Sequence, residues 1–136
     1  MRCLYCGTDT EVTNSRLQRR SNNVWRRRQC KACRAIFTTH ESIDLSSTLL
    51  VAKNGRNEPF KNDLLFTELL LALQDRKNCY GDAREATHTI IQKLLKLPDK
   101  PLFDTSQISR VAGDVLAKLD RQAYLRYVSE HPSLQG

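Results

Sequence analysis

The sequence holds two short cysteine pairs, CLYC at residues 3–6 and CKAC at residues 30–33, separated by 23 residues. Each pair can supply two thiolates from one tight turn, and Gly7 eases the turn after the first pair. Four thiolates complete a tetrahedral shell, so the spacing predicts one structural zinc ion rather than a catalytic metal. Two disulfides or free buried thiols are the alternatives. The predicted ligands are Cys3, Cys6, Cys30 and Cys33.

The residues between and after the cysteine pairs are predicted to form a three-stranded antiparallel sheet. TEVTNS (10–15) and VWRRRQC (24–30) have the composition of strands, the polar QRRSNN (18–23) is predicted as their turn, and AIFTTHE (35–41) supplies a third strand. Such a segment has few large apolar side chains to bury. Zinc binding, with apparent free energies of roughly 10–16 kcal/mol, would therefore order it.

Positive charge is concentrated in this first part of the chain. Residues 1–40 contain nine Lys and Arg against two acidic residues, whereas residues 41–136 contain thirteen of each sign, so the first part carries the whole net charge of +7. A basic segment beside a neutral one indicates a polyanionic partner for the first, and nucleic acid is the favoured one. A solvated charged face is the alternative.

Three consecutive arginines lie on the predicted second strand. Because side chains alternate along a strand, Arg26 and Arg28 should point to one face, and Trp25 and Arg27 to the other. Guanidinium groups suit phosphate oxygens and guanine edges. The negative charge of four thiolates around one zinc ion lessens the repulsion among these arginines but does not cancel it, which leaves room for an external polyanion.

The remaining residues predict a hairpin followed by helices. STLLVAKNGRNEPF (47–60) has an apolar run, the turn pair Asn54-Gly55 and a short return strand. Helical periodicity then predicts four helices: a central one within 62–76 capped by Asn62 or Asp63, and others capped by Asp82, by Asp104 or Thr105, and by Asp120. The fold class is α+β, with a zinc ribbon at residues 1–45 and a mainly helical domain with a β-hairpin at residues 46–136. A generic helical bundle without a ligand fits the same periodicity.

Six motifs resemble one known family, the NrdR-type transcriptional repressors of bacterial ribonucleotide reductase genes. They are MRCLYCG (1–7), NSR (14–16), RRRQC (26–30), FTTHE (37–41), GRNEPF (55–60) and LDRQAYLRYVS (119–129). The resemblance implies a zinc ribbon that binds paired operator boxes in double-stranded DNA, and an ATP-cone that senses ATP against dATP. It implies that nucleotide state changes the homo-oligomer and hence DNA binding. By position, the DNA contacts would be Arg16, Arg26, Arg27 and Arg28.

The resemblance also implies adenine nucleotide binding by Val51, Lys53, Arg56 and Glu58. Two positions depart from the family pattern, since Ala52 and Leu64 stand where the family has lysines. Lys53 should point to the strand face opposite Ala52, so it replaces the missing charge only if a bulge realigns the strand. The family also continues past the equivalent of Gly136 with a helical tail, and contacts made by that tail are expected to be absent or altered.

Two other interpretations stay open at this stage. The ribbon can bind DNA while a non-sensing cone serves only for oligomerisation, or the ribbon can dock on RNA polymerase or RNA. We expect no enzyme, because the chain has no catalytic triad, open metal site or Walker loop. No apolar run approaches the roughly 18 residues of a membrane span, and no signal peptide is evident, so a cytoplasmic protein without membrane contact is expected.

Overall fold

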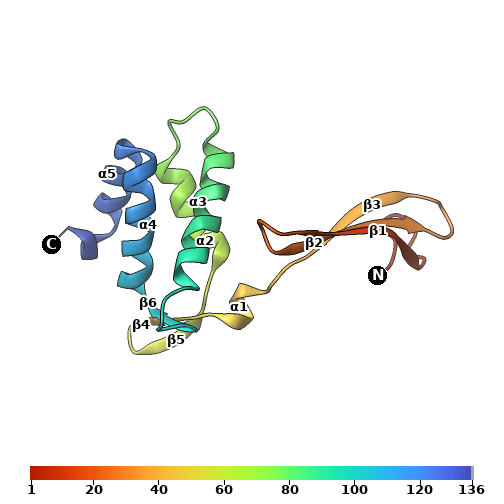
Figure 1. Ribbon diagram of the computed structural model, residues 1–136, viewed down its shortest axis with the longest axis horizontal. Coiled ribbons are helices and arrows are strands. Elements are labelled where there is room, and N and C mark those ends of the chain that lie inside the picture. Colours follow the sequence, from red (N-terminus) through yellow and green to blue (C-terminus); the bar gives the residue numbers. More distant parts are fainter. Residues whose placement is uncertain (136) are drawn as a thin grey trace. The chain divides into compact units, whose positions relative to one another are not determined.

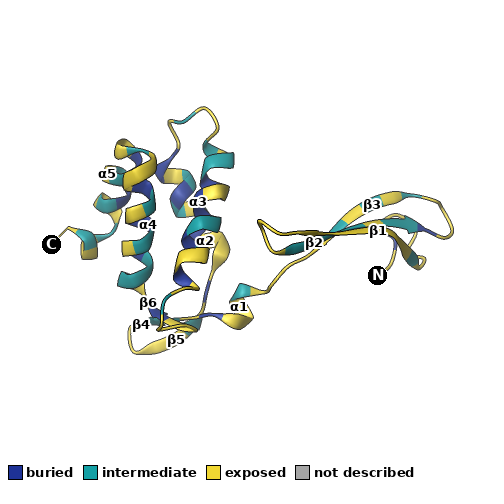
Figure 2. Cartoon of the chain, viewed as in Figure 1, coloured by how far each residue is buried: buried dark blue, intermediate teal, exposed yellow. Residues whose placement is uncertain are grey.

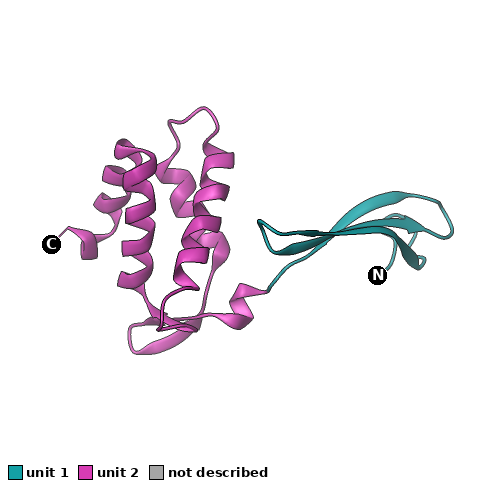
Figure 3. Ribbon diagram, viewed as in Figure 1, with its two compact units in different colours: residues 1–43 teal, residues 44–136 magenta. Residues whose placement is uncertain are grey.

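The computed structural model describes residues 1–135, and Gly136 lies outside the described residues. The chain forms two compact units, Met1–Ile43 and Asp44–Gly136 (Figure 3). The division falls two residues before the predicted boundary, because Asp44 already caps a short helix of the second unit through a hydrogen bond from the Ser46 N–H. Each unit has its own architecture.

The first unit is a three-stranded antiparallel sheet with strand order β1-β2-β3. Its strands are β1 (Thr10–Gln18), β2 (Asn23–Cys30) and β3 (Ile36–Glu41) (Figure 1). The first strand runs three residues further than predicted, which shortens the turn, and Asn22 adopts the positive φ of 50° that this turn needs. Thr13 is an extra residue that interrupts the β1–β2 register between Val12 and Asn14.

The first unit has almost no buried interior. Of its 43 residues, all of them described, only Cys3 and Cys30 are buried. Both faces of the sheet are therefore accessible, and a hydrophobic core cannot be what orders this segment. This observation supports the expectation that a bound metal, in place of a core, orders the segment.

The second unit packs helices against a small sheet with strand order β5-β4-β6 (Figure 1). Strands β4 and β5 form the predicted hairpin, and Asn54 and Gly55 at its turn have φ values of 52° and 75°. The strands are β4 (Leu50–Lys53), β5 (Arg56–Pro59) and β6 (Leu102–Asp104). The helices are α1 (Leu45–Thr48), α2 (Asn62–Ala72), α3 (Cys79–Leu94), α4 (Thr105–Leu119), α5 (Arg121–Glu130) and the 3-10 turn Pro132–Leu134. The α+β class with a ribbon followed by a mostly helical region is confirmed.

The core of the second unit lies mainly among the helices, and Phe103 of β6 joins it from the sheet (Figure 2). Helix α4 packs against α3, α5, β4 and β6, so α4 and not α2 is the central helix. Helix α2 exposes Leu64 and Leu71 to 52% and 60%, which contradicts its predicted central position. The largest fully buried side chains of this core are Leu49, Leu69, Leu73, Ile90, Leu94, Phe103 and Leu116.

Two of the predicted helix starts are wrong and two are confirmed. Helix α2 has Lys61 at its N-cap without a side-chain hydrogen bond, and α3 begins at Cys79, three residues before the predicted cap Asp82. Asp104 caps α4 in a complete capping box, as one of its two predicted options, and Asp120 caps α5. Strand β6 was not predicted, because it is three residues long and follows the helix-breaking LPDKP segment.

Candidate functional site

The four paired cysteines come together at one end of the first unit. Their sulfur atoms all lie within 4.8 Å of one another, with 3.7 Å between the Sγ atoms of Cys3 and Cys33 and 3.5 Å between those of Cys6 and Cys30. A tetrahedral zinc ion with Zn–S bonds of about 2.3 Å requires sulfur–sulfur edges of about 3.8 Å. The arrangement therefore fits a single zinc ion. Among residues 1–135 this is the only cluster of three or more potential metal ligands.

The two turns that carry the cysteines direct backbone N–H groups at the sulfur atoms. Tyr5 N–H donates to Cys3 Sγ and Ala32 N–H donates to Cys30 Sγ, each at 3.4 Å. Gly7, with φ of 75°, closes the first turn and donates its N–H to the Cys3 carbonyl at 3.0 Å. Such N–H donors stabilise thiolates, the form that binds metal.

The cysteines of this cluster differ in how readily they become thiolates. Hydrogen bonds from Thr8, first from its side chain and then from its backbone, lower the pKa of Cys6 to about 6. The N–H of Ala35 lowers the pKa of Cys33, but partial desolvation and the neighbouring cysteines outweigh it and raise that pKa to about 11. Opposite shifts in one cluster mean that adjacent thiolates repel. A divalent cation removes this conflict by stabilising every thiolate at once.

The sheet register distributes the four predicted arginines over both faces, two on each. Residues directly opposite in an antiparallel pair lie on the same face. Arg26 lies opposite Ser15 and Thr39, whereas Arg27 lies opposite Asn14 and Thr38. Alternation along β2 then puts Arg28 with Arg26, and Trp25 with Arg27, as predicted. Arg16 is opposite Trp25 and thus shares the face of Arg27.

One of these faces holds its arginines in place. Arg26 donates from its two terminal nitrogens to Ser15 Oγ at 2.9 Å and to Glu41 Oε2 at 3.0 Å, and Arg28 donates from Nε to Thr39 Oγ1 at 3.1 Å. We call this the buttressed face, made of Ser15, Arg26, Arg28, Thr39 and Glu41. Sequence reasoning did not identify Ser15, Thr39 or Glu41 as site residues, because their contacts depend on the strand register.

The opposite face leaves its arginines unrestrained. Arg16 and Arg27 are exposed, and within residues 1–135 neither guanidinium has a hydrogen bond or ion pair. Trp25 and His40 lie opposite each other on this face. We call it the open face, made of Asn14, Arg16, Trp25, Arg27, Thr38 and His40. Both faces are thus cationic, but only one holds its guanidinium groups in a fixed orientation.

A cavity of about 200 Å³ in the second unit contains three of the four residues predicted to bind a nucleotide. Val51, Lys53 and Glu58 line it, whereas Arg56 does not. Lys53 reaches the cavity without a bulge, since the β4–β5 register is regular and Val51 and Lys53 share one strand face. Lys53 thus lines this cavity from the strand face opposite Ala52. The lining is completed by Pro59, Phe60, Lys61, Leu64, Leu65, Glu68, Thr105, Ile108, Ser109, Tyr127 and His131.

Two lining residues bear on the departures from the family pattern. Leu64, at the position of an expected lysine, lines the cavity, and Lys61 lines it from the helix N-cap one turn earlier. Lys53 and Lys61 are thus two basic residues among those that line the cavity. The sequence alone does not place Lys61 at the cavity, because its position relative to the hairpin depends on how the chain enters α2.

Polar groups from α2 and α5 line the same cavity. The His131 ring stacks on the Tyr127 ring with centroids 3.9 Å apart, and His131 Nε2 lies 3.5 Å from Glu68 Oε2. Burial is the main cause that raises the pKa of Tyr127 to about 12, so its hydroxyl stays protonated at neutral pH. No sequence motif points to this contact, because it joins residues 63 positions apart.

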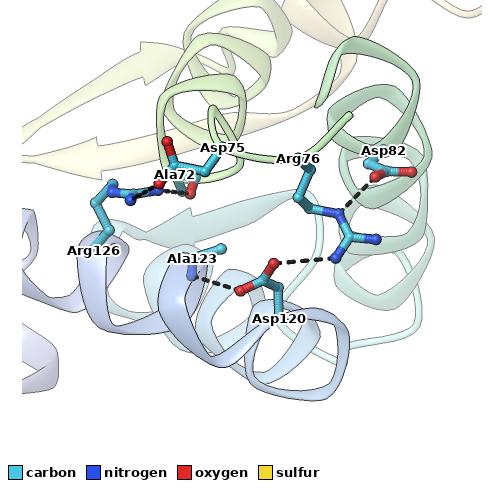
Figure 4. Close-up of polar contacts among 7 residues, drawn as sticks. All are labelled: Ala72, Asp75, Arg76, Asp82, Asp120, Ala123 and Arg126. Carbon is cyan, nitrogen blue, oxygen red and sulfur yellow. Dashed lines mark hydrogen bonds and ion pairs between the residues drawn. The ribbon is translucent and has the colours of Figure 1, made fainter. Parts of the chain in front are cut away.

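Arg76 belongs to a structural network instead of the cavity. Its Nε donates to Asp82 at 2.7 Å, and a terminal nitrogen donates to Asp120 at 3.1 Å, which joins the starts of α3 and α5 (Figure 4). Arg126 binds the Ala72 carbonyl at 2.8 Å in the same region. These ion pairs hold Arg76 at the helix ends, and it does not line the cavity.

Together these features define a class: a metal-binding ribbon with a cationic sheet, followed by a mainly helical unit that contains a cavity. Residues 1–41 match the family described as "Transcriptional repressor NrdR-like, N-terminal domain". The full chain is similar to curated proteins named "Transcriptional repressor NrdR", at 34% identity in Nitrosospira multiformis, covering 100% of this chain and 86% of that protein. For the relative in Cupriavidus metallidurans the values are 36%, 99% and 87%, and for Chromobacterium violaceum 35%, 99% and 89%.

The chain belongs to the NrdR family of transcriptional repressors, which confirms the resemblance drawn from its motifs. It is accordingly a regulator and not an enzyme, and a repressor of transcription acts on DNA. The clustered cysteines of a zinc ribbon support one structural zinc ion. Among the helices of residues 1–135, none combines the length and apolar character needed to span a bilayer.

Proposed function

We propose that this protein represses ribonucleotide reductase genes by binding paired boxes in operator DNA through its zinc ribbon, under control of ATP and dATP bound in the second unit. The single observation that carries the proposal is the four-cysteine cluster at the end of a cationic sheet that has no apolar core. Cys3, Cys6, Cys30 and Cys33 hold the zinc ion. The ion supplies no catalysis; it crosslinks the two turns and so fixes the strands between them.

DNA binding is assigned to the four arginines of the sheet. Arg16, Arg26, Arg27 and Arg28 account for much of the excess positive charge of the first unit. Guanidinium groups bind phosphates and guanine edges, and a duplex that neutralises them releases its counterions. The stiff sheet turns these cations into a surface that can match a groove. The ribbon thereby acts as the DNA-binding part of the repressor.

Nucleotide binding is assigned to the cavity lined by Val51, Lys53 and Glu58. Lys53 and Lys61 both line this cavity, and ammonium groups bind phosphate oxygens by charge-assisted hydrogen bonds. These two lysines take over the role of the family lysines that are Ala52 and Leu64 here. Arg56 lies opposite Lys53 in the hairpin register and adds positive charge to the hairpin without lining the cavity.

Control of DNA binding then runs through the homo-oligomer, as in the family. Paired operator boxes require two ribbons at a set separation, so an assembly that changes with the bound nucleotide changes which boxes can be held together. ATP and dATP differ by one hydroxyl group. A site distinguishes the two nucleotides when a buried polar group forms a hydrogen bond with that hydroxyl. The two nucleotides select different assemblies only if each binds one assembly more tightly.

One experiment tests both halves of this proposal. The zinc-loaded chain is used to select duplexes from a random library, and binding to the enriched duplex is followed by fluorescence anisotropy without nucleotide, with ATP and with dATP. We expect paired boxes about an integral number of helical turns apart, and affinities that differ between ATP and dATP. The K53A and K61A variants should lose this difference yet keep the affinity measured without nucleotide.

Each result points to a different part of the proposal. Enrichment of no duplex rejects the DNA-binding role and favours docking on RNA or RNA polymerase. Enrichment that is indifferent to both nucleotides, together with no calorimetric binding below millimolar concentrations, rejects the sensing role. In that case the second unit serves for oligomerisation alone.

A further inference from the structure

The two faces of the β1-β2-β3 sheet hold their arginines differently, and we propose that Ser15, Thr39 and Glu41 position Arg26 and Arg28 to read base edges of duplex DNA. This inference rests on the proposed DNA-binding function and assigns its sequence-reading part to the buttressed face. The open face then adds affinity through phosphates without choosing a sequence. Three residues with no assigned role thereby become positioning residues for two arginines.

Arg28 presents a free fork. Its Nε–H is occupied by Thr39 Oγ1 at 3.1 Å, while neither terminal nitrogen has a partner among the described residues. Guanine offers two acceptors in the major groove, O6 and N7, and an arginine binds both when its two outer N–H groups are free and fixed in orientation. Because the hydroxyl of Thr39 holds the inner nitrogen, it fixes the plane of the guanidinium without using the groups that a guanine needs.

Arg26 is held from two sides. Its terminal nitrogens donate to Ser15 Oγ at 2.9 Å and to Glu41 Oε2 at 3.0 Å, and each of these nitrogens keeps a second N–H. The ion pair is accessible, with side-chain exposures of 32% for Arg26 and 69% for Glu41, so it adds little to folding stability. Its main effect is on orientation: Glu41 and Ser15 stop Arg26 from turning toward the nearest phosphate.

The spacing of the two held arginines suits a duplex. Arg26 and Arg28 are two residues apart on one strand face, which separates their Cα atoms by about 6.6 Å. Two base-pair steps span about 6.8 Å along the helix axis. A strand that lies along the major groove therefore presents the two guanidinium groups to bases two pairs apart, in a groove wide enough for a β-ribbon.

The open face has no side-chain acceptors that orient its arginines among the described residues. Arg16 and Arg27 are exposed and have no acceptor among residues 1–135, so their side chains sample many rotamers. A mobile cation follows the phosphate potential of any sequence, whereas discrimination between bases needs a fixed donor pattern. The same residue type thus serves two purposes on the two faces of one strand.

The test compares variants that keep the charge but change the fork. A duplex enriched by the wild-type chain from a random library serves as one probe, and a scrambled duplex of equal composition as the other; anisotropy gives both Kd values. R28K keeps the charge but loses the fork, and should lower the ratio of the two affinities by about 5- to 100-fold. The matched control R27K should change both affinities by a similar factor and keep the ratio.

Thr39 provides the readout specific to positioning. T39V removes only the hydroxyl and should lower the affinity ratio by about 2- to 10-fold, whereas T39S keeps the hydroxyl and should retain the wild-type ratio. Zinc content and Trp25 fluorescence show which variants are folded. If T39V fails to fold, the R28K and R27K pair still decides.

The outcomes separate the inference from the function on which it rests. Equal losses of discrimination in R28K and R27K, or a T39V variant with the wild-type ratio, overturn the buttressed face as the reading surface. A wild-type chain that enriches no duplex overturns the proposed DNA-binding function itself. Retained discrimination in R27K together with its loss in R28K and T39V, restored in T39S, supports the inference.

Discussion

Single carboxylates at helix starts make this fold sensitive to acid. Asp120 accepts a hydrogen bond from the Ala123 N–H at 3.1 Å and forms an ion pair with Arg76. Both contacts lower the pKa of Asp120, and the hydrogen bond from Ala123 has the larger effect. A lowered folded-state pKa means that the stabilisation is present above the unfolded-state value of about 3.9 and is lost as pH falls through the folded-state pKa. One side chain thus couples helix α5 to α3 in a pH-dependent way.

We predict that D120N reduces the loss of stability on acidification. Asparagine can still cap the helix, but it carries no charge to lose. The urea midpoint, followed by ellipticity at 222 nm, should therefore fall less between pH 6 and pH 3 in D120N than in wild type. D114N is the matched control on α4, where Asp114 makes no hydrogen bond or ion pair among the described residues. An identical pH dependence in wild type and D120N would contradict the prediction.

At the scale of elements, the turn of the β4–β5 hairpin lies next to a residue that lines the cavity. Gly55 has φ of 75°, and no atom lies within 4 Å of a Cβ added there, so a larger residue meets only backbone strain. Lys53 immediately precedes this turn and lines the cavity. The conformation of two turn residues therefore bears on the position of one residue that lines the cavity.

We predict that G55A destabilises the second unit by about 1 kcal/mol, because alanine disfavours positive φ. Urea denaturation at 222 nm measures this change. The control N54G relieves a φ of 52° at the neighbouring position and should cause no comparable loss. A G55A variant as stable as wild type would show that the turn rearranges at no cost.

Sequence patterns predicted those elements whose signals are local. The cysteine pairs, the Asn54-Gly55 turn and the caps Asp104 and Asp120 each act within a few residues, and the structure has them. Strand β6 has no local signal, because it exists through parallel pairing with β4, some fifty residues earlier. Leucines all around α2 predicted a central helix, yet the tertiary packing leaves some of them exposed.

The residues of the candidate site also divide into those with a local sequence signal and those without one. The four cysteines could be predicted because metal ligands come in pairs at fixed spacing. The contacts of Thr39 and Glu41 with arginines could not, since a shift of register by one residue would send these side chains to the other face. Lys61, Glu68 and His131 meet in one cavity only after α2 and α5 have packed. Long-range packing, which leaves no periodic trace in the sequence, determines these positions.

At the scale of the whole molecule, the two units are stabilised by different forces. In the first unit only two cysteines are buried, whereas the second has a continuous hydrophobic core. The single tryptophan, Trp25, lies in the first unit, and all helices lie in the second. Fluorescence and far-UV ellipticity therefore report on the two units separately.

We predict that a zinc chelator unfolds the first unit and leaves the second folded. Trp25 emission should shift to longer wavelength, while ellipticity at 222 nm should keep nearly its full value, because the hydrophobic core contains no metal. Adding zinc back is the control and should restore the emission. Loss of both signals together would mean that the helical unit depends on the ribbon.

The cavity of the second unit draws its wall from both ends of that unit's sequence, residues 51–68 and residues 105–131. A ligand seated there acts as a non-covalent staple between the hairpin side and the last long helix. Opening of the unit would first have to expel it, so occupancy slows cleavage of the intervening residues 69–104 by proteases that attack transiently opened chains. Resistance to digestion thus becomes a measure of occupancy that needs no knowledge of the ligand's chemistry.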